Sequence, residues 1–432
     1  MVRDREQTGG RVILLGAVCW ITYFSIYLGR LNFSAGMSGM LQTGLWEKGQ
    51  LGSVAAAFYL AYGIGQYPSG LLGDRIPARW MVGAGLLGSA LVNILFPAAG
   101  TVSGMRGMWF VNGLLQAMIW PPMVRLVTSR VNAGCSVRII LLLSFSSPAG
   151  MLCTYLASAV ILQMGSWEWC FLSAGIWLAG VAVLWFVLTA AVERTVPPRE
   201  KEPRQRDASH NRSNRNNRNK WNKWNNWKKT AVLSPGLLCL TMAAFLQGIL
   251  KDGLTTWIPT YLTEKFTLPA SFAVLLTMVL PVVSLCGIPA AQTANRRFFQ
   301  NEAVVGAICY LLSLGSFLCM LGEGGNSLYG TVILFAMVTS MMVAVNTVLV
   351  SLLPLHFGKE GRVATVSGMM NAVTYLGSAA ASVLFGYTME YAGWKDTQTV
   401  WCVCAAAGGF FCMGAIRNWK RNRKDIYGER TD

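Results

Sequence analysis

Three charged residues lie deep inside long apolar runs of the sequence. Arg30 falls in SIYLGRLNFSAGM, and Lys251 and Asp252 are neighbours in QGILKDGLTTWIPTYL. A charged group in such a run is costly unless it faces a cavity or a partner, so each is a candidate functional residue. Each cation stands about four residues, or roughly 6 Å along a helix, beyond the centre of its run. Two cations at matching depth indicate a site for a small anion, although either one alone could extend its side chain to the edge of the apolar layer.

Tyrosines at helical spacing accompany Arg30. Tyr23 and Tyr27 precede it by seven and three residues, so all three share one face of a helix. Buried Tyr and Asn side chains also hold helices together, so a binding role and a packing role both stay open for each of them. The other polar candidates of the apolar runs are Tyr62 with Gln66, at i and i+4, and Asn371 with Tyr375.

Asp252 is the one acidic residue deep in an apolar run. Proton-coupled carriers rely on carboxylates or histidines inside the membrane, and neither His210 nor His356 lies at that depth. Two roles are therefore open for Asp252. It is either a counter-charge to Lys251, or a single carrier of a proton or a sodium ion.

The composition is typical of a membrane protein. Apolar residues make up 53% of the 432 residues and charged residues 13%, against roughly 25% in soluble domains. The eleven cysteines form no CxxC, and two histidines are too few for a metal or haem site, so we expect no cofactor and no metal. The apolar runs hold no paired carboxylates and no Ser–His pair, so we do not expect an enzyme.

Twelve apolar segments are long enough to span a bilayer, which takes about 20 residues per helix. We expect an all-α membrane protein with two pseudo-symmetric six-helix bundles. The N-terminal bundle covers 1–192, a basic linker covers 193–230, and the C-terminal bundle with a short tail covers 231–432. The expected spans are 12–40, 50–73, 80–99, 104–125, 138–164 and 168–192 in the first half, and 231–263, 267–292, 302–322, 327–355, 364–389 and 397–416 in the second.

The distribution of Lys and Arg over the loops predicts the orientation. Of the 36 Lys and Arg residues, 30 fall on the side that carries both termini and four fall on the opposite side. Because cytoplasmic loops carry the excess of Lys and Arg, we expect both termini in the cytoplasm. This predicts a multi-pass protein of the cell (inner or plasma) membrane, and we expect it to be a monomer.

The linker between the two halves is strongly basic. Residues 193–229 hold twelve Lys and Arg against four acidic residues, and Trp221, Trp224 and Trp227 recur every three residues near its end. We interpret it as a solvated cytoplasmic segment whose end lies on anionic lipid. A partner-docking segment and a platform for single-stranded nucleic acid are the alternatives. Loop asymmetry already accounts for the net charge of +17, so we expect no nucleic acid partner.

A loop between the second and third spans, GLLGDRIPAR, resembles the GxxxDRxxxR signature of the major facilitator superfamily. A degenerate copy, AQTANRR, follows the eighth span, and a repeat at the same place in both halves indicates two related bundles. In this interpretation Gly70 permits close helix packing, and the charged residues hold one conformation until transport breaks their contacts. The predicted conformational residues are Gly70, Asp74, Arg75 and Arg79, with Asn295 and Arg296 in the second copy.

Four further stretches together resemble the organophosphate:phosphate antiporters, the group of the glycerol-3-phosphate and hexose-phosphate transporters. They are YLGRLNFSAGM around Arg30, WPPMVR at 120–125, TTWIPTYL at 255–262 and GYTMEYAGW at 386–394. The resemblance implies that one arginine from the first span and one from the seventh clamp a phosphate in a rocker-switch cycle. Arg30 matches the first arginine, and Lys251 stands at the position of the second.

The chain departs from that family pattern at three positions of the site. Lys251 cannot offer the planar bidentate fork of arginine, although lysine binds phosphate as a point charge. Gln66 stands at the position of a family lysine, and Ser147, in LSFSSPAG, at the position of a family histidine. We predict a secondary transporter of a small organic anion, an organophosphate exchanged for phosphate. The alternatives are a symporter of carboxylates or other anions coupled to protons or sodium, and a non-transporting sensor of the same fold.

Overall fold

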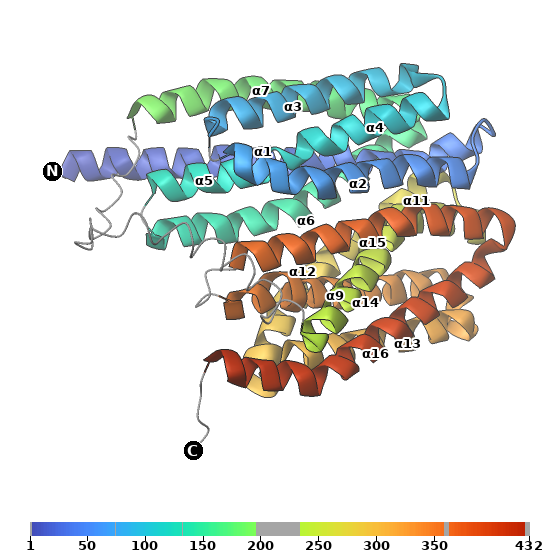
Figure 1. Ribbon diagram of the computed structural model, residues 1–432. Coiled ribbons are helices and arrows are strands. Elements are labelled where there is room, and N and C mark those ends of the chain that lie inside the picture. The colour runs from blue at the N-terminus through green and yellow to red at the C-terminus, as the bar shows by residue number, and fades with distance from the viewer. Residues whose placement is uncertain (1, 74, 132, 196–233, 358–362, 428–432) are drawn as a thin grey trace, which may run out of the picture.

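The chain folds into two bundles of helices that lie against each other in the computed structural model (Figure 1). The structure describes residues 2–73, 75–131, 133–195, 234–357 and 363–427. Within these ranges every regular element is a helix and no strand occurs. The all-α fold of two six-helix bundles is thereby confirmed. The predicted linker, 193–230, lies almost entirely outside the described ranges.

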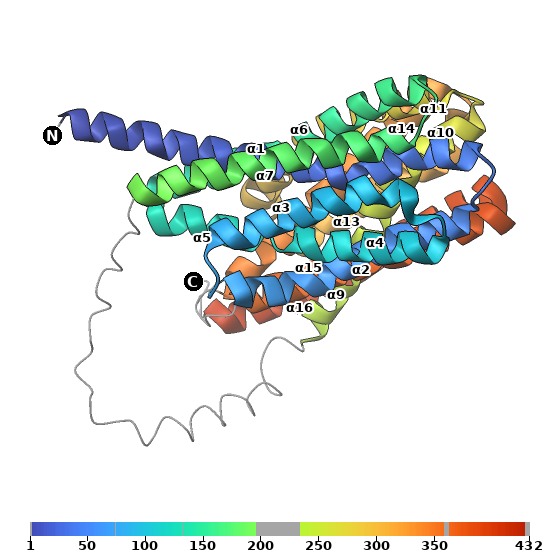
Figure 2. The ribbon, with the colours of Figure 1, turned by 90° about the horizontal axis from the view of Figure 1, so that it is seen from above.

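The N-terminal bundle contains the first six segments that the sequence predicts. Its first helix is the longest and extends beyond the rest of the bundle at its N-terminal end (Figure 2). The elements are α1 (Val2–Gln42), α2 (Lys48–Gly73), α3 (Ala78–Leu95), η1 (Phe96–Ala99), α4 (Val102–Ala117), α5 (Trp120–Arg130), α6 (Ala133–Gln163) and α7 (Glu168–Thr195).

The C-terminal bundle contains the second six segments, several of which are divided by short π or 3-10 turns. The elements are α9 (Pro235–Gly248), η4 (Ile249–Gly253), α10 (Leu254–Lys265), α11 (Ala270–Leu276), α12 (Val279–Thr293), η5 (Ala294–Phe299), α13 (Glu302–Leu321), η6 (Glu323–Gly325), α14 (Leu328–Asn346), η7 (Thr347–Leu352), η8 (Leu353–Phe357), α15 (Val363–Tyr391) and α16 (Gly393–Tyr427).

The fourth segment is divided into two helices, α4 and α5. The first ends at Ala117 and the second begins at Trp120, with Pro121 and Pro122 in its first turn. Proline lacks an amide hydrogen and is tolerated in the first turn of a helix, where that donor has no partner. The proline pair therefore starts a new helix inside what the sequence predicts as a single span over 104–125.

The seventh segment contains a π-helical turn at its two charged residues. The turn η4 carries Lys251 and Asp252 and joins α9 to α10. Such turns recur at functional sites, where one extra residue re-aims the side chains. Just before the turn, a Cβ on Gly248 would lie 1.9 Å from the carbonyl oxygen of Thr374, so only glycine permits this approach to α15.

Ten helical segments in the described ranges are long and apolar enough to cross a bilayer. The α4–α5 pair falls short because its helices have 16 and 11 residues. Helix α2 has 26 residues but mixes Gly, Ser, Gln and Tyr with its apolar residues. It packs against α4 of its own bundle and α15 of the other, so its composition reflects an interior position.

Within the described ranges, close glycine contacts join the two bundles near one end of the molecule. We call the end with both termini the terminal end, and the opposite end the far end (Figure 1). Near the far end, a Cβ on Gly52 of α2 would lie 2.3 Å from the carbonyl oxygen of Ser382 on α15. Toward the terminal end, a Cβ on Gly70 of α2 or Gly368 of α15 would meet no atom within 4 Å. The glycines of α2 thus approach α15 closely near the far end and, at Gly63, beside Tyr375, but not near the terminal end.

Polar contacts also join the bundles at the far end. Lys48 Nζ lies 2.9 Å from Glu264 Oε2, and Trp394 Nε1 donates to the same oxygen at 2.8 Å. The backbone N–H of Lys48 donates to Glu390 Oε2 at 3.0 Å. We call Lys48, Glu264, Glu390 and Trp394 the far-end cluster.

Candidate functional site

Arg30 lies between the two bundles inside a box of aromatic rings. Its side chain is half-buried, and no carboxylate oxygen in the described ranges lies within 4 Å of it. Rings facing the guanidinium replace part of its hydration, which stabilises the cation without neutralising it. The ring centres lie 4.8 Å (Tyr62), 5.1 Å (Phe58), 5.6 Å (Tyr59), 5.6 Å (Tyr375) and 5.9 Å (Tyr27) from Arg30 Cζ.

A buried amide cluster in the N-terminal bundle holds the backbone just before Arg30. The carbonyl oxygen of Gly29 accepts hydrogen bonds from Asn112 Nδ2 at 2.9 Å and Gln116 Nε2 at 3.0 Å. Asn93 Nδ2 lies 3.4 Å from the same oxygen, and its Oδ1 accepts from Asn32 Nδ2 at 2.7 Å. Asn32 thus turns into its own bundle, while Arg30 extends toward the other.

Lys251 and Asp252 form an ion pair on the opposite bundle. Lys251 Nζ lies 2.7 Å from Asp252 Oδ1, and Ser378 Oγ of α15 donates to Asp252 Oδ2 at 2.7 Å. The carboxylate is buried and the lysine half-buried. Helix α15 brings the three charged residues together, because its Tyr375 ring lies 5.6 Å from Arg30 Cζ and its Ser378, one turn further on, donates to Asp252.

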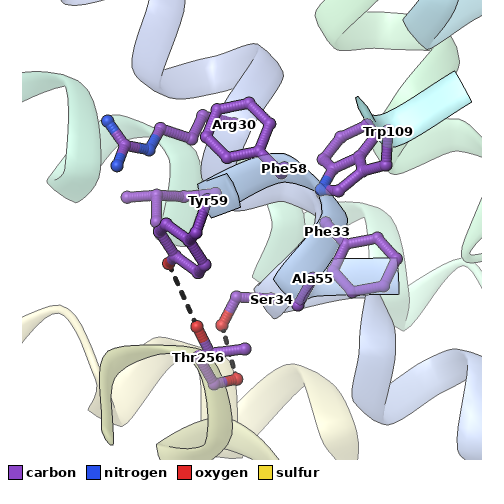
Figure 3. A pocket seen from close by; sticks show the side chains of 9 residues that line it. Arg30, Phe33, Ser34, Ala55, Phe58, Tyr59, Trp109 and Thr256 are labelled. Atoms are coloured by element: carbon purple, nitrogen blue, oxygen red, sulfur yellow. Dashed lines mark hydrogen bonds between the residues drawn. The ribbon is translucent and has the colours of Figure 1, made fainter. Parts of the chain in front are cut away.

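The far-end side of Arg30 is closed by hydrogen bonds between the bundles. Tyr59 Oη and Thr256 Oγ1 are 3.1 Å apart, and Ser34 Oγ donates to the carbonyl oxygen of Thr256 at 2.8 Å (Figure 3). Ser34 Oγ also lies 3.0 Å from the carbonyl oxygen of Thr255. The cavity that these side chains line with Arg30 measures about 10 Å³, which holds about one water molecule. A solute larger than water therefore has no room on the far-end side of Arg30 in this conformation.

The remaining predicted binding residues are Tyr23, Gln66, Ser147 and Asn371. Tyr23 packs on Tyr27 and on Trp120, with ring centres 5.7 and 4.5 Å apart, and so forms a second layer toward the terminal end. Three predicted residues are half-buried and make no side-chain hydrogen bond within the described part of the chain. They are Gln66 on α2, Ser147 on α6 and Asn371 on α15.

Several residues of the site are not singled out by the sequence. Phe58 and Tyr59 precede Tyr62 by four and three residues in AAAFYLAY. This spacing places them on the same helix face as Tyr62 and could have identified them as site residues. Thr256 and Ser378 carry no such signal, because small polar residues in apolar helices serve packing as often as binding. Only the fold shows that Ser378, on α15, reaches the carboxylate on η4.

The structure partly corrects the interpretation of the first loop signature. The close packing predicted at Gly70 is wrong for this conformation, since a Cβ there meets nothing, whereas a Cβ on Gly73 would lie 3.2 Å from Pro122 Cγ. Arg125 donates to the carbonyl oxygen of Gly73 and ties the end of α2 to α5. Asp74 lies outside the described residues, Arg75 is exposed, and the half-buried Arg79 has its guanidinium carbon 5.4 Å from the ring centre of Trp80.

The second copy of the signature leads to a buried glutamate. Asn295 is buried and its Nδ2 donates to Glu302 Oε1 at 3.2 Å, while Arg296 is exposed. Glu302 Oε1 lies 2.7 Å from His356 Nε2, and its Oε2 accepts from Trp419 Nε1 at 2.9 Å. One carboxylate thereby joins η5, α13, η8 and α16 at the terminal end of the C-terminal bundle.

The comparisons with known proteins place the chain in a family. Residues 19–382 match the Major Facilitator Superfamily. The chain belongs to this superfamily, which comprises membrane transporters rather than enzymes. A solved structure of a bacterial homologue of the human lysosomal transporter Spinster, in an inward-facing and occupied conformation, has the same fold. It superposes with a TM-score of 0.77 at 13% identity and covers 95% of this chain and 97% of that one.

Curated relatives confirm the resemblance to the organophosphate:phosphate antiporters. Sugar phosphate exchanger 3 of Bos taurus is 26% identical over 378 residues, which cover 80% of this chain and 75% of the relative. The glycerol-3-phosphate transporter of Bacillus subtilis is 24% identical over 397 residues, 87% of this chain and 86% of the relative. The membrane sensor protein UhpC of Escherichia coli is 31% identical, but over 118 residues that span only 27% of each chain.

Proposed function

We propose that the protein is a secondary transporter that carries a small organophosphate in exchange for inorganic phosphate. The observation that carries this proposal is the position of Arg30. Its guanidinium lies between the two bundles, among five aromatic rings, with Lys251 on the facing bundle. Arginine matches the geometry of a phosphate group better than any other side chain, and Lys251 adds a second positive charge.

The arrangement of the bundles supports alternating access as the mechanism. The far end is closed by the contacts of Tyr59, Ser34 and Thr256, and by the close approach of Gly52 to Ser382. A cycle would break these contacts and close the terminal end, where α2 and α15 now stand apart. An anion between Arg30 and Lys251 attracts both bundles at once, which favours the passage between the two states.

The loop residues and the membrane setting belong to the same proposal. Arg75, Arg79 and Arg296 lie at the terminal end, where the bundles must approach in the opposite conformation. We propose that the terminal end faces the cytoplasm of the cell membrane, in which case this conformation corresponds to an inward-open state. We further propose that the protein is a monomer and that its basic linker lies on anionic lipid.

Phosphate exchange in proteoliposomes tests the proposal. Uptake of labelled phosphate is measured into vesicles preloaded with phosphate or with buffer alone. We expect uptake that requires internal phosphate and that is lost in Arg30→Ala and Lys251→Ala. The matched controls are Arg106→Ala and Lys395→Ala, which remove one positive charge each from an exposed position and should retain exchange.

Two other outcomes would lead to a different conclusion. Phosphate or organophosphate binding without any flux, in protein shown to be folded, would favour a sensor, for which the similarity to the membrane sensor protein UhpC is the specific observation. Carboxylate uptake driven by a proton or sodium gradient, and lost in Asp252→Asn, would favour a symporter. Absence of both binding and flux for phosphate and organophosphates would refute the proposed function.

A further inference from the structure

We infer that the site accepts its substrate as a monoanion, and that Asp252 is the residue that sets this limit. This inference rests on the proposed function and names the charge of the phosphate species that the site binds. The inference comes from the net charge of the site. With Asp252 included this net charge is +1, whereas the two cations alone would give +2.

Three ionised side chains face the space between the bundles in the described part of the chain. Arg30 and Lys251 contribute two positive charges and Asp252 one negative charge, so the empty site carries a net charge of +1. The remaining titratable groups that face Asp252 are the phenols of Tyr59 on α2, Tyr155 on α6 and Tyr375 on α15. A phenol is neutral near pH 7, so these groups leave the sum unchanged.

Asp252 is fixed in the site and cannot withdraw when an anion enters. One of its oxygens pairs with Lys251, and the other accepts from Ser378. The helix around it is held against α15 by close contacts, since a Cβ on Gly248 would lie 1.9 Å from the carbonyl oxygen of Thr374. A rotation of the Lys251 side chain from Asp252 toward a bound anion would leave the net charge of the site unchanged.

The surroundings of the site make its net charge important for the energy of the loaded state. Aromatic rings surround Arg30, so once the bundles enclose a bound anion little solvent is left to screen an excess charge. A monoanion brings the loaded site to neutrality before the bundles rock. A dianion would leave one uncompensated negative charge next to Asp252, and an unpaired charge inside a membrane protein is strongly unfavourable.

The dependence of phosphate exchange on pH tests the inference. Inorganic phosphate changes from monoanion to dianion as the pH rises through its second pKa. We expect the KM of the wild type for total phosphate to rise by about tenfold for each pH unit above that pKa, because only the monoanion binds. A KM that stays constant or falls over this range would overturn the inference while leaving the proposed function intact.

Variants that change the charge of the site test whether Asp252 restricts binding to monoanions. In Asp252→Asn the site carries a net +2, and we expect the rise of KM with pH to disappear or reverse. Lys251→Ala has a net charge of zero, whereas in the double variant Lys251→Met, Asp252→Asn Arg30 alone provides +1. The exchange lost in the single variant should therefore return in part in the double variant, with the preference for the monoanion. The control Asp396→Asn makes the same change at an exposed position and should keep the pH dependence of the wild type. An unaltered pH dependence in Asp252→Asn would refute the role of this residue.

A second measurement needs only the wild type and so does not depend on the folding of any variant. Methyl sulfate carries one negative charge at every pH used, and sulfate carries two. We expect methyl sulfate to inhibit phosphate exchange more strongly than sulfate, at a pH where the wild type is active. Stronger inhibition by sulfate would overturn the inference. Absence of phosphate exchange at every pH would instead refute the proposed function on which the inference rests.

Discussion

Tyr59 Oη and Thr256 Oγ1 lie 3.1 Å apart and join α2 of one bundle to α10 of the other, just beyond Arg30 (Figure 3). The residues that we propose to bind an anion and those that close the far end are thus neighbours along the same helices. Tyr59 belongs to both groups, because its ring also lies 5.6 Å from Arg30 Cζ. A substrate that moves Arg30 therefore also acts on the far-end closure.

Tyr59→Phe should weaken the closed far end while keeping the ring beside Arg30. The loss of one hydrogen bond costs about 1 kcal/mol, which shifts the equilibrium between the conformations by roughly fivefold. The shift can be measured in a variant whose native cysteines are replaced and which carries one new cysteine at Ala55. Ala55 is buried on the far-end side of the site, so the rate at which this cysteine is alkylated reports opening of the far end. Thr256→Val should give a similar increase in labelling, and a decrease in either variant would contradict the prediction.

Gly52→Ala should have a larger effect on the same equilibrium. A Cβ there would lie 2.3 Å from the carbonyl oxygen of Ser382, a backbone atom that cannot turn away, so α2 and α15 must separate at the far end. Labelling of the cysteine at position 55 should increase by more than in Tyr59→Phe. Gly70→Ala is the matched control on the same helix, since a Cβ there meets nothing in this conformation, and it should not increase the labelling.

Glu264→Gln should have only a small effect on the far-end closure. The carboxylate pairs with Lys48 Nζ at 2.9 Å, but its side chain is 33% exposed, and such ion pairs contribute about 0–1 kcal/mol. We expect an increase in labelling at position 55 below about fivefold, and a smaller one at high salt, where the pair is already screened. A change as large as that in Gly52→Ala would show that the far-end cluster, rather than helix packing, controls the closure.

Arg30→Lys should retain the positive charge but lose the planar fork. Charged hydrogen bonds are worth about 1.5–3 kcal/mol each, so we expect the KM for phosphate to rise by roughly ten- to a hundredfold. The exchange rate at saturating phosphate should fall less than in Arg30→Ala. Equal loss in both variants would mean that the shape of the guanidinium, and not its charge, is essential.

Glu302→Ala should destabilise the C-terminal bundle without changing the substrate site. The buried carboxylate accepts from Trp419 and Asn295 and pairs with His356, so its removal takes this acceptor from the buried Trp419 Nε1 and Asn295 Nδ2. We expect a loss of about 3 kcal/mol in the free energy of unfolding. The unfolding temperature in detergent provides the measurement, and Glu47→Ala, at an exposed position, should leave it unchanged.

The sequence predicts the number and order of the segments because a bilayer imposes a length and a polarity on each of them. It also points to Arg30, Lys251 and Asp252, since charge in an apolar run is rare and costly. These features are local, and each can be recognised within about 20 residues of the chain.

The features that the sequence does not reveal depend on contacts between distant residues. The hydrogen bond from Ser378 to Asp252 joins residues 126 positions apart, and the one between Tyr59 and Thr256 joins residues 197 apart. The packing at Gly70 was predicted wrongly because a sequence does not specify which conformation is populated. A glycine that has open space in one state is compatible with close packing in the other.

The closure of α2 on α15 at one end only has a consequence for the surrounding lipid. Two bundles that approach at one end and separate at the other would take up unequal areas in the two leaflets of the bilayer. Rocking to the opposite state reverses this inequality, so lipids whose shape favours curvature in one leaflet would stabilise one state over the other. The mechanical state of the membrane would then act on the rate of exchange without any contact with the substrate.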